Sequence, residues 1–287
     1  MIDYPASVPP VERLGKRLRH AVHWLGLAWR HHGVPPAVVV YPDAPSRRTA
    51  LYRMCRALGW ELTNRPRRRA VLHLRFEDAT EKRAARPDWW PEGAWNERCD
   101  DIRKSTLDAA HQAVFGYGVT VDPATYQGTM LEKGHGNALH DGREVEGPIA
   151  AATPGKVYQR IVDNRAADGR AVDLRLVYIH GAFPAVYHKY KPEGARYTNE
   201  TTDVHMGAVD ADFSADERGR IRALMAALHV DYAELDCLRD RGDGRLYVVD
   251  VNPTPWGPPA GLPAAEAAQA VAVCAAAFKD ACRAGRP

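Results

Sequence analysis

The order of apolar positions in the first third of the chain predicts an α/β unit. A helix is expected from about Val11 to His32, because apolar residues recur there at helical spacing: Leu14, Leu18, Val22, Leu25 and Trp29. The apolar runs at 37–41 and 70–76 are typical of buried strands. Residues 47–58 between them are expected to form a helix that ends at Gly59. Strand, helix and strand in this order favour an α/β arrangement.

The rest of the chain is expected to mix strands and helices. A helix from Ile102 to about Phe115 would be capped by Asp100 or Asp101, and Ser214 with Glu217 forms a capping-box pattern before a second helix. Strands are expected at 119–123, up to about Lys133, and at 157–162, 172–179, 184–190, 232–238 and 246–251, with a terminal helix at 264–282. Two pairs of these strands are separated by short loops and are expected to pair as hairpins.

Composition excludes several classes of protein. Apolar residues make up 45% and charged residues 26% of the 287, which is typical of a globular protein. A net charge of +3 gives no general affinity for polyanions, so no nucleic-acid partner is expected. The basic cluster 65–69 is more typical of a solvated loop. No apolar run could span a bilayer, so no membrane partner is expected, and no signal-peptide pattern occurs. Five scattered cysteines indicate a reducing compartment, and we expect a cytoplasmic protein.

The stretch from Arg245 to Pro259 combines a buried strand with polar side chains near its end. Asp250 and Asn252 are two positions apart, so they point to the same face of the strand. A carboxylate and an amide oxygen side by side suit a hard cation such as Mg²⁺. The alternative is a buried aspartate satisfied by backbone donors and an asparagine that caps a turn. Spacing alone leaves both interpretations open.

Polar motifs follow one another in a distinctive order between about Asp101 and Gly261. In order they are a helix with Lys104, a strand with Lys133 and a glycine loop, Gln-x-x-Val at 159–162, Asp-x-Arg at 173–175, Arg-x-x-Asn at 196–199, Asp236, and Asp-x-Asn-Pro-x-Pro at 250–255. This order resembles the ATP-grasp superfamily of carboxylate ligases. The branch that includes glutathione synthetase and the ligase that adds glutamate to a ribosomal protein is the most similar.

This resemblance implies a fold and a division into domains. The implied class is α/β and α+β, an ATP-grasp fold preceded by a small N-terminal α/β domain of the pre-ATP-grasp kind. Residues 1–98 would form that domain, residues 99–158 a subdomain with the phosphate-binding lysine and glycine loop, and residues 159–287 a subdomain with the metal site and the C-terminal helix.

The resemblance also implies a nucleotide site. Lys104 and Lys133 would contact the phosphates of ATP, although surface lysines are the alternative for each. The loop with Gly134, Gly136 and Asn137 would cover the phosphates, and a mobile hairpin turn is its alternative. The implied hinge that offers backbone groups to adenine consists of Gln159, Arg160, Ile161 and Val162, and a plain core strand is the alternative. Asp163 would reach the ribose.

The remaining motif residues imply the chemistry. Arg175, which shares a strand face with Asp173, would face the transferred phosphoryl group, while Arg196 and Asn199 would lie near an acyl phosphate. The alternative for Asp173 and Arg175 is one exposed ion pair. The implied ligands of Mg²⁺, with Mn²⁺ as the second choice, are Asp236, Asp250 and Asn252. The family usually has Glu at the second of these positions, and the shorter Asp250 would bring the metal closer or bind it through one oxygen.

The function implied is ATP- and Mg²⁺-dependent ligation of a carboxylate to an amine through an acyl phosphate, with release of ADP. The alternatives are a small-molecule kinase with the same ATP site and a nucleotide-binding module without turnover. Small molecules or peptides are the expected substrates, and a homodimer is left open. The histidines near the motifs leave a zinc site open, although their spacing matches no standard pattern: His135, His140, His180, His188 and His205.

Overall fold

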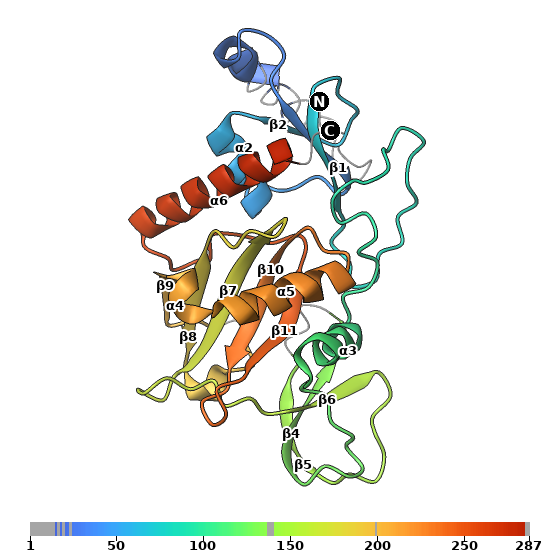
Figure 1. Cartoon of the computed structure of the whole chain (residues 1–287), viewed down its shortest axis with the longest axis vertical. Helices are drawn as coiled ribbons and strands as arrows, with labels where there is room; N and C mark the ends of the chain where they lie inside the picture. Colours follow the sequence, from blue (N-terminus) through green and yellow to red (C-terminus); the bar gives the residue numbers. More distant parts are fainter. Residues whose placement is uncertain are drawn as a thin grey trace.

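The computed structural model describes residues 15, 18, 21–22, 25–136, 141–198 and 200–284 of the chain. Three β-sheets follow one another along the length of the molecule (Figure 1). A three-stranded sheet from the N-terminal part lies at one end, a five-stranded sheet occupies the middle, and a second three-stranded sheet lies at the other end. No helix among these residues is both long enough and apolar enough to cross a membrane.

The N-terminal sheet has the α/β character that the sequence predicts. It contains β1 (Ala37–Pro42), β2 (Glu61–Thr63) and β3 (Ala70–Phe76) in the parallel order β2-β1-β3. Helix α2 (Ala50–Leu58) begins three residues later than predicted, because the Thr49 side chain accepts from the backbone N–H of Tyr52 and caps it there. Gly59 ends α2 in the left-handed conformation, as expected.

The N-terminal apolar stripe does not form part of the core. Residues 25–30 are helical, as predicted. The stripe residues Leu18, Val22, Leu25 and Trp29 are nevertheless exposed, and Leu27 is the buried apolar side chain of this segment. The helical spacing of the stripe is real, but its face has no partner among the described residues.

The distal sheet is antiparallel and lies beyond helix α3 (Lys104–Phe115). Its strands β4 (Gly128–Gly134), β5 (Arg143–Gly147) and β6 (Lys156–Arg160) have the order β5-β4-β6. Two predictions were wrong here. Arg103 is the N-cap of α3 without a side-chain cap bond, because Asp101 bonds Thr106 and Arg103 instead. Residues 119–123 do not form a strand, since Thr120 makes only one isolated bridge, to Gln159.

The central sheet is antiparallel throughout and has the strand order β11-β10-β7-β8-β9. Its strands are β7 (Ala171–Ile179), β8 (Val186–Lys191), β9 (Asp203–Gly207), β10 (Tyr232–Arg239) and β11 (Leu246–Asn252). The predicted hairpins β7–β8 and β10–β11 are therefore confirmed. Between the strands lie a 3₁₀ turn (Glu193–Ala195), α4 (Val209–Asp212) and α5 (Ala215–Ala227), and α6 (Ala264–Ala284) follows the sheet.

Each face of the central sheet has its own core. Helices α3 and α5 pack on one face, and α5 begins with the predicted capping box of Ser214 and Glu217. Helix α6 covers part of the other face and packs against α2 and the N-terminal sheet, with Phe278 fully buried between them. One end of that second face therefore joins the N-terminal sheet to the central sheet through an apolar core.

Asn96 adds a polar connection between the same two parts. Its side chain is fully buried, donates to the carbonyl of Tyr232 at 2.8 Å, and accepts from the backbone N–H groups of Asp231 and Tyr232 at 2.7 and 3.0 Å. Its φ of 55° lies in the left-handed region, which asparagine tolerates better than most residues. The side chain thus satisfies three backbone groups at the start of β10.

We predict that Asn96→Ala lowers the free energy of unfolding by about 2–4 kcal/mol, because three buried backbone groups lose their partner and the left-handed backbone becomes strained. Urea denaturation followed by circular dichroism measures this change. Arg98→Ala, at a nearby exposed position, serves as the control and should change the stability by less than about 0.5 kcal/mol. Equal stability of both variants would contradict the connecting role of Asn96.

Candidate active site

The second face of the central sheet changes from apolar to charged along its strands. On β10, Tyr232 packs in the core under α6, whereas Asp236 lies two strand pleats further along the same face. Asp236 on β10 is paired in register with Arg175 on β7. The charged half of the face opens into a cavity of about 570 Å³.

The cavity brings together most of the residues predicted for nucleotide and metal binding. Its walls come from α3, β4, β6, the central sheet and the segment after β11, so it lies between the distal sheet and the central sheet. The predicted residues that line it are Lys104, Lys133, Gln159, Arg160, Ile161, Val162, Asp173, Arg175, Arg196, Asp236, Asp250 and Asn252. The cavity thus brings together residues as far apart in the chain as Lys104 and Asn252, which are separated by 148 positions.

Two aspartates from adjacent strands face each other at the floor of this cavity. Asp236 and Asp250 are directly paired across β10 and β11. Burial raises the pKa of Asp250 to about 6, and the neighbouring charge of Asp236 adds to the effect. Burial would also raise the pKa of Asp236, but the Arg175 guanidinium overcomes this and holds it well below its ordinary value. The two carboxylates are therefore electrostatically distinct.

Arg175 binds Asp236 through two hydrogen bonds. Its Nε and Nη2 atoms lie 2.8 and 3.0 Å from the two carboxylate oxygens of Asp236. Its Nη1 atom lies 3.8 Å from the buried carboxyl of Glu234. Asp173 is paired with Lys191 at 2.5 Å instead. The alternative of one exposed pair between Asp173 and Arg175 is therefore wrong, because each has its own partner on a neighbouring strand.

Asn252 combines the two roles that its sequence context left open. Its Oδ1 atom accepts from the backbone N–H of Thr254 at 2.9 Å, so the side chain does cap the turn after β11. It also lines the cavity together with Asp236 and Asp250. Two carboxylates and one amide oxygen form an all-oxygen donor set, which fits Mg²⁺ or Mn²⁺. The raised pKa of Asp250 supports the same fit, since a cation there would remove the repulsion between the carboxylates.

Three lysines project into the cavity without a carboxylate partner. Burial lowers the pKa of Lys133 to about 8, with the charge of Lys104 as a second cause, and burial also lowers the pKa of Lys104. Lys104 donates to the carbonyl of Gly136 at 2.7 Å, but none of the ion pairs among the described residues involves Lys104, Lys133 or Lys189. Largely desolvated cations that lack a carboxylate partner favour the binding of an anionic ligand.

Sequence reasoning missed Lys189 and Lys191. Both lie on β8, on the same face as Arg175, and both line the cavity. Their signal was the alternation in the sequence from 187 to 191, where lysines replace the apolar residues expected of a buried face. Lys189 is only 8% exposed, and burial lowers its pKa, with Arg175 as a second cause.

One end of the cavity is suited to a flat apolar group. Four apolar side chains line it: Val119, Leu131, Leu238 and Val249. Ile161 forms no backbone–backbone hydrogen bond with another described residue, so its N–H and carbonyl remain available at this end. The carbonyl of Val162 is already taken by Arg196 at 2.7 Å and by the N–H of Asn164. A ligand ring would therefore find a free carbonyl at Ile161 rather than at Val162.

Several predicted residues lie elsewhere. Asp163 does not line the cavity, because its carboxylate is paired with Arg165 at 2.7 Å. Gly134 and Gly136 lie beside the cavity, at the end of β4, and the N–H of Gly134 donates to Asp141 at 3.0 Å. Asn137 and Asn199 fall outside the described residues.

The histidines have other partners. His180 stacks on Trp95 at 4.9 Å, and His188 and His205 each lie 2.7 Å from an aspartate, Asp212 and Asp203. His135 lies 3.5 Å from the Ser105 hydroxyl, and His140 falls outside the described residues. Within the described ranges, no three His, Cys, Asp or Glu side chains are grouped to hold a metal.

Comparison by sequence identifies no relative, since no protein-family model matches the chain and no curated protein matches it significantly. Comparison by structure finds ATP-grasp ligases. The ligase PsnB, in complex with the precursor peptide PsnA2 and AMPPNP, is 13% identical, with 86% of this chain and 98% of that chain covered at a TM-score of 0.56. PsnB with minimal precursor, Mg and ADP gives 13% identity, 85% and 98% coverage and a TM-score of 0.54.

A D-alanine–D-alanine ligase from Bacillus anthracis is also matched, with 11% identity, 87% and 95% coverage and a TM-score of 0.47. The similarity to PsnB extends over nearly the whole of both chains and includes the parallel N-terminal sheet and the antiparallel sheets. The predicted fold is confirmed: this chain has the mixed α/β architecture of the ATP-grasp ligases.

Proposed function

We propose that the protein is an ATP- and Mg²⁺-dependent ligase that joins a carboxylate to an amine through an acyl phosphate and releases ADP. The fold supports this assignment, because the ATP-grasp ligases share it at low sequence identity. The three segments 1–98, 99–158 and 159–287 would then act as the parts that enclose the nucleotide. Within this proposal, Asn137 and Asn199 keep their predicted roles at the phosphates and the acyl phosphate.

The observation that carries the proposal is the distribution of charge in the cavity. Lys104, Lys133 and Lys189 are cations without carboxylate partners, and Asp236 with Asp250 forms a pair of carboxylates that repel each other. Each set is costly when it stands alone. A nucleotide triphosphate with its metal supplies the missing charges to both, since the phosphates are anionic and the metal is cationic.

The chain's own residues then serve phosphoryl transfer. Arg175 is held in place by Asp236, so its guanidinium is oriented before the substrate arrives. Lys189 and Arg196 approach from β8 and from the segment that follows it, and would stabilise charge on the acyl phosphate. When bound, Mg²⁺ would neutralise charge on the phosphate oxygens. The described walls on both sides of the cavity would limit access of water to the acyl phosphate.

The substrate class follows less directly. PsnB has been solved with a precursor peptide, which supports a peptide, or a small molecule with a free carboxylate, as the substrate of this protein as well. A screen for ADP release with pairs of amino acids and short peptides tests the reaction. Release that requires both a carboxylate and an amine would support ligation, whereas release with a hydroxyl compound alone would indicate a kinase.

We predict that Lys133→Met has opposite effects on stability and on binding. At pH 7 the unfolded lysine is charged at no cost, whereas the folded state must hold that charge beside Lys104 with a pKa of about 8. Loss of the charge removes this cost and should raise the stability of the ligand-free protein. The expected gain is only about 1 kcal/mol, because solvent screens part of the cost. The ATP affinity should fall at least about tenfold.

Thermal unfolding without ligand and calorimetry with ATP and Mg²⁺ measure the two effects. The gain in stability should disappear as the pH rises from 8 to 10.5, since the native lysine of the parent protein loses its charge in that range. Lys156→Met, which removes a lysine that pairs with Asp141, is the control and should not stabilise the protein. A parallel loss of stability and affinity in Lys133→Met would contradict the phosphate-binding role.

Asp250→Asn is predicted to separate metal binding from folding. The amide is nearly isosteric with the carboxyl and removes the repulsion with Asp236, so the ligand-free protein should be at least as stable as the parent. The increase of the melting temperature that Mg²⁺ and ATP produce together should be largely lost, because a metal ligand is missing. Retention of the full increase would show that the metal lies elsewhere.

Arg175→Lys is predicted to affect turnover more than nucleotide affinity. Lysine keeps the charge but loses the planar fork that binds both carboxylate oxygens of Asp236 at once and thereby fixes the orientation of the cation. ADP release should fall by roughly two powers of ten or more, and ATP affinity by much less. Arg239→Lys, on the same sheet but bound to Glu217 outside the cavity, is the control with unchanged turnover. Equal losses in affinity and turnover would make Arg175 an ordinary binding residue.

A further inference from the structure

A second cavity of about 580 Å³ lies at the opposite end of the N-terminal sheet from the active-site cavity. The carboxyl end of β3 leads to Asp78, which lines the active-site cavity, whereas the first residues of β3, Ala70 and Val71, line the second one. We call this second cavity the basic pocket, after five side chains that line it: His31, Arg68, Arg69, Lys279 and Arg283.

The charge of the basic pocket is one-sided. No aspartate or glutamate is among its described lining residues. Arg69 donates to the carbonyl of Val34, and His31 lies 2.8 Å from the carbonyl of Gly59, so both have structural partners. No ion pair among the described residues takes up the other three, Arg68, Lys279 and Arg283.

The neighbouring Arg67 shows that a basic side chain in this region can be paired with a carboxylate. Arg67 belongs to the same basic run, 65–69, but it forms a two-point pair with the buried Glu61 at 2.7 and 2.9 Å. Two of these three cations, Lys279 and Arg283, lie on α6, more than 200 residues further along the chain than Arg68. The basic side chains of the pocket are thus gathered by tertiary folding from separate elements.

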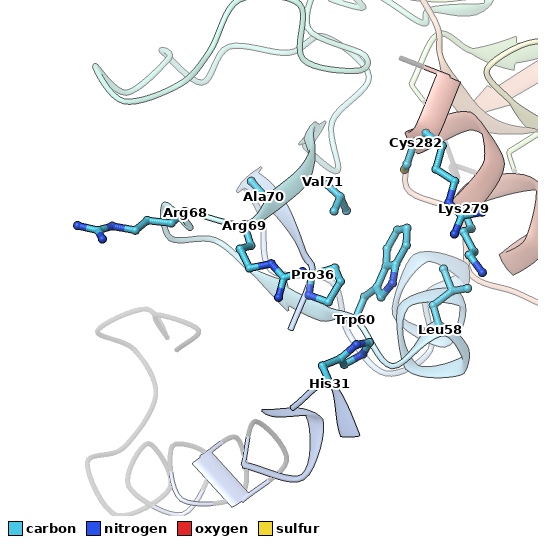
Figure 2. A pocket seen from close by; sticks show the side chains of 11 residues that line it. His31, Pro36, Leu58, Trp60, Arg68, Arg69, Ala70, Val71, Lys279 and Cys282 are labelled. Carbon is cyan, nitrogen blue, oxygen red and sulfur yellow. The ribbon is translucent and has the colours of Figure 1, made fainter. Parts of the chain in front are cut away.

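The floor of the basic pocket is apolar. Trp60, Leu58 and Val71 line it, and Figure 2 shows Trp60 in the middle of the labelled residues, between Lys279 and Arg69 in this view. The Trp60 ring also packs on Phe278, with 6.1 Å between ring centroids, so the floor is anchored in the core. An apolar floor with a charged rim suits a ligand whose apolar group is flanked by anionic groups.

The backbone around the pocket distinguishes a peptide from a phosphate. Phosphate sites commonly use free N–H groups at helix N-termini. Here α2 and α6 contribute their last turns, through Leu58 and Arg283, and helix C-terminal turns present carbonyls rather than N–H groups. The N–H groups at the strand starts, such as those of Ala37 and Ala70, already bond carbonyls. A peptide supplies carboxylates for the cations together with an apolar side chain for the floor, which a phosphate does not.

We propose that the basic pocket docks an acidic peptide segment, with an apolar side chain on Trp60 and flanking carboxylates on Arg68, Lys279 and Arg283. This site is separate from the proposed ligase site and does not depend on turnover. It would let the protein hold a peptide or a protein partner at a distance from the nucleotide.

Fluorescence anisotropy of the full-length chain with labelled acetyl-Glu-Leu-Glu-Phe-Glu-amide tests the proposal. We expect saturable binding that is at least tenfold tighter than that of the matched peptide with glutamine in place of glutamate, and that weakens as salt is added. The double variant Lys279→Glu and Arg283→Glu should weaken binding at least tenfold. Saturating ADP with Mg²⁺ should leave the binding unchanged, because that ligand would occupy the other cavity.

The matched control is Arg83→Glu with Arg98→Glu, which changes the net charge equally at two exposed positions outside both cavities. It should bind the peptide as the parent does. Equal weakening by both double variants would reduce the effect to net charge and overturn the proposal. Absence of peptide binding up to millimolar concentrations would also overturn it. So would a protein that binds tripolyphosphate but not the peptide, if the double variant in α6 abolishes the tripolyphosphate binding.

Discussion

The half-buried pair of Arg175 and Asp236 determines how the charged half of the central sheet can be built. Two charges that leave water need each other, and loss of one partner would leave the other uncompensated. The pairing register of β7 and β10 places the two residues opposite each other, so the sheet itself satisfies this requirement. Burial and the neighbouring charge of Asp236 raise the pKa of Asp250 to about 6, because Arg175 binds Asp236 and not Asp250. The cavity therefore keeps an unbalanced set of charges. The candidate site is therefore a region where the charges of the folded protein are incompletely compensated.

The loop after β11 depends on a second close contact behind that pair. A Cβ atom at Gly257 would lie 2.8 Å from the carboxyl of Glu234, so only glycine lets the loop lie against the sheet at this point. Burial raises the pKa of Glu234 to about 7, and its Oε2 atom has no hydrogen-bond partner in the described structure. The same loop carries Thr254, whose hydroxyl lies 3.3 Å from Asp78 of the N-terminal part. One loop thus connects β11, which carries two of the proposed metal ligands, to the N-terminal part.

The candidate active-site cavity and the basic pocket differ in how charge is distributed. In the active-site cavity, cations and carboxylates face one another, which suits a metal–nucleotide complex that carries both signs. In the basic pocket the described charges are all positive and surround an apolar floor. The two cavities lie at opposite ends of the N-terminal sheet, so the sheet separates the proposed site of ligation from the proposed docking site. Asn96 and the core around Phe278 hold that sheet to the central one.

The sequence by itself determined the elements whose signals are local. Apolar alternation predicted the hairpins, Ser214 and Glu217 predicted the start of α5, and the spacing of Asp250 and Asn252 predicted that both face one side. Ordered motifs over 160 residues pointed to the ATP-grasp fold. Predictions failed where a competing local bond or the pairing of neighbouring segments decided the outcome, as at Asp101 and at residues 119–123.

Only the tertiary structure decided which charges would be paired. Lys133 and Lys156 are lysines of similar local context, yet one faces a cavity and the other binds Asp141. Arg67 and Arg68 are adjacent, yet one binds Glu61 and the other lines the basic pocket. The energy of a charge depends on burial and on the groups within a few ångströms. Those neighbours are set by how separate strands, helices and loops pack together, so no local pattern contains them.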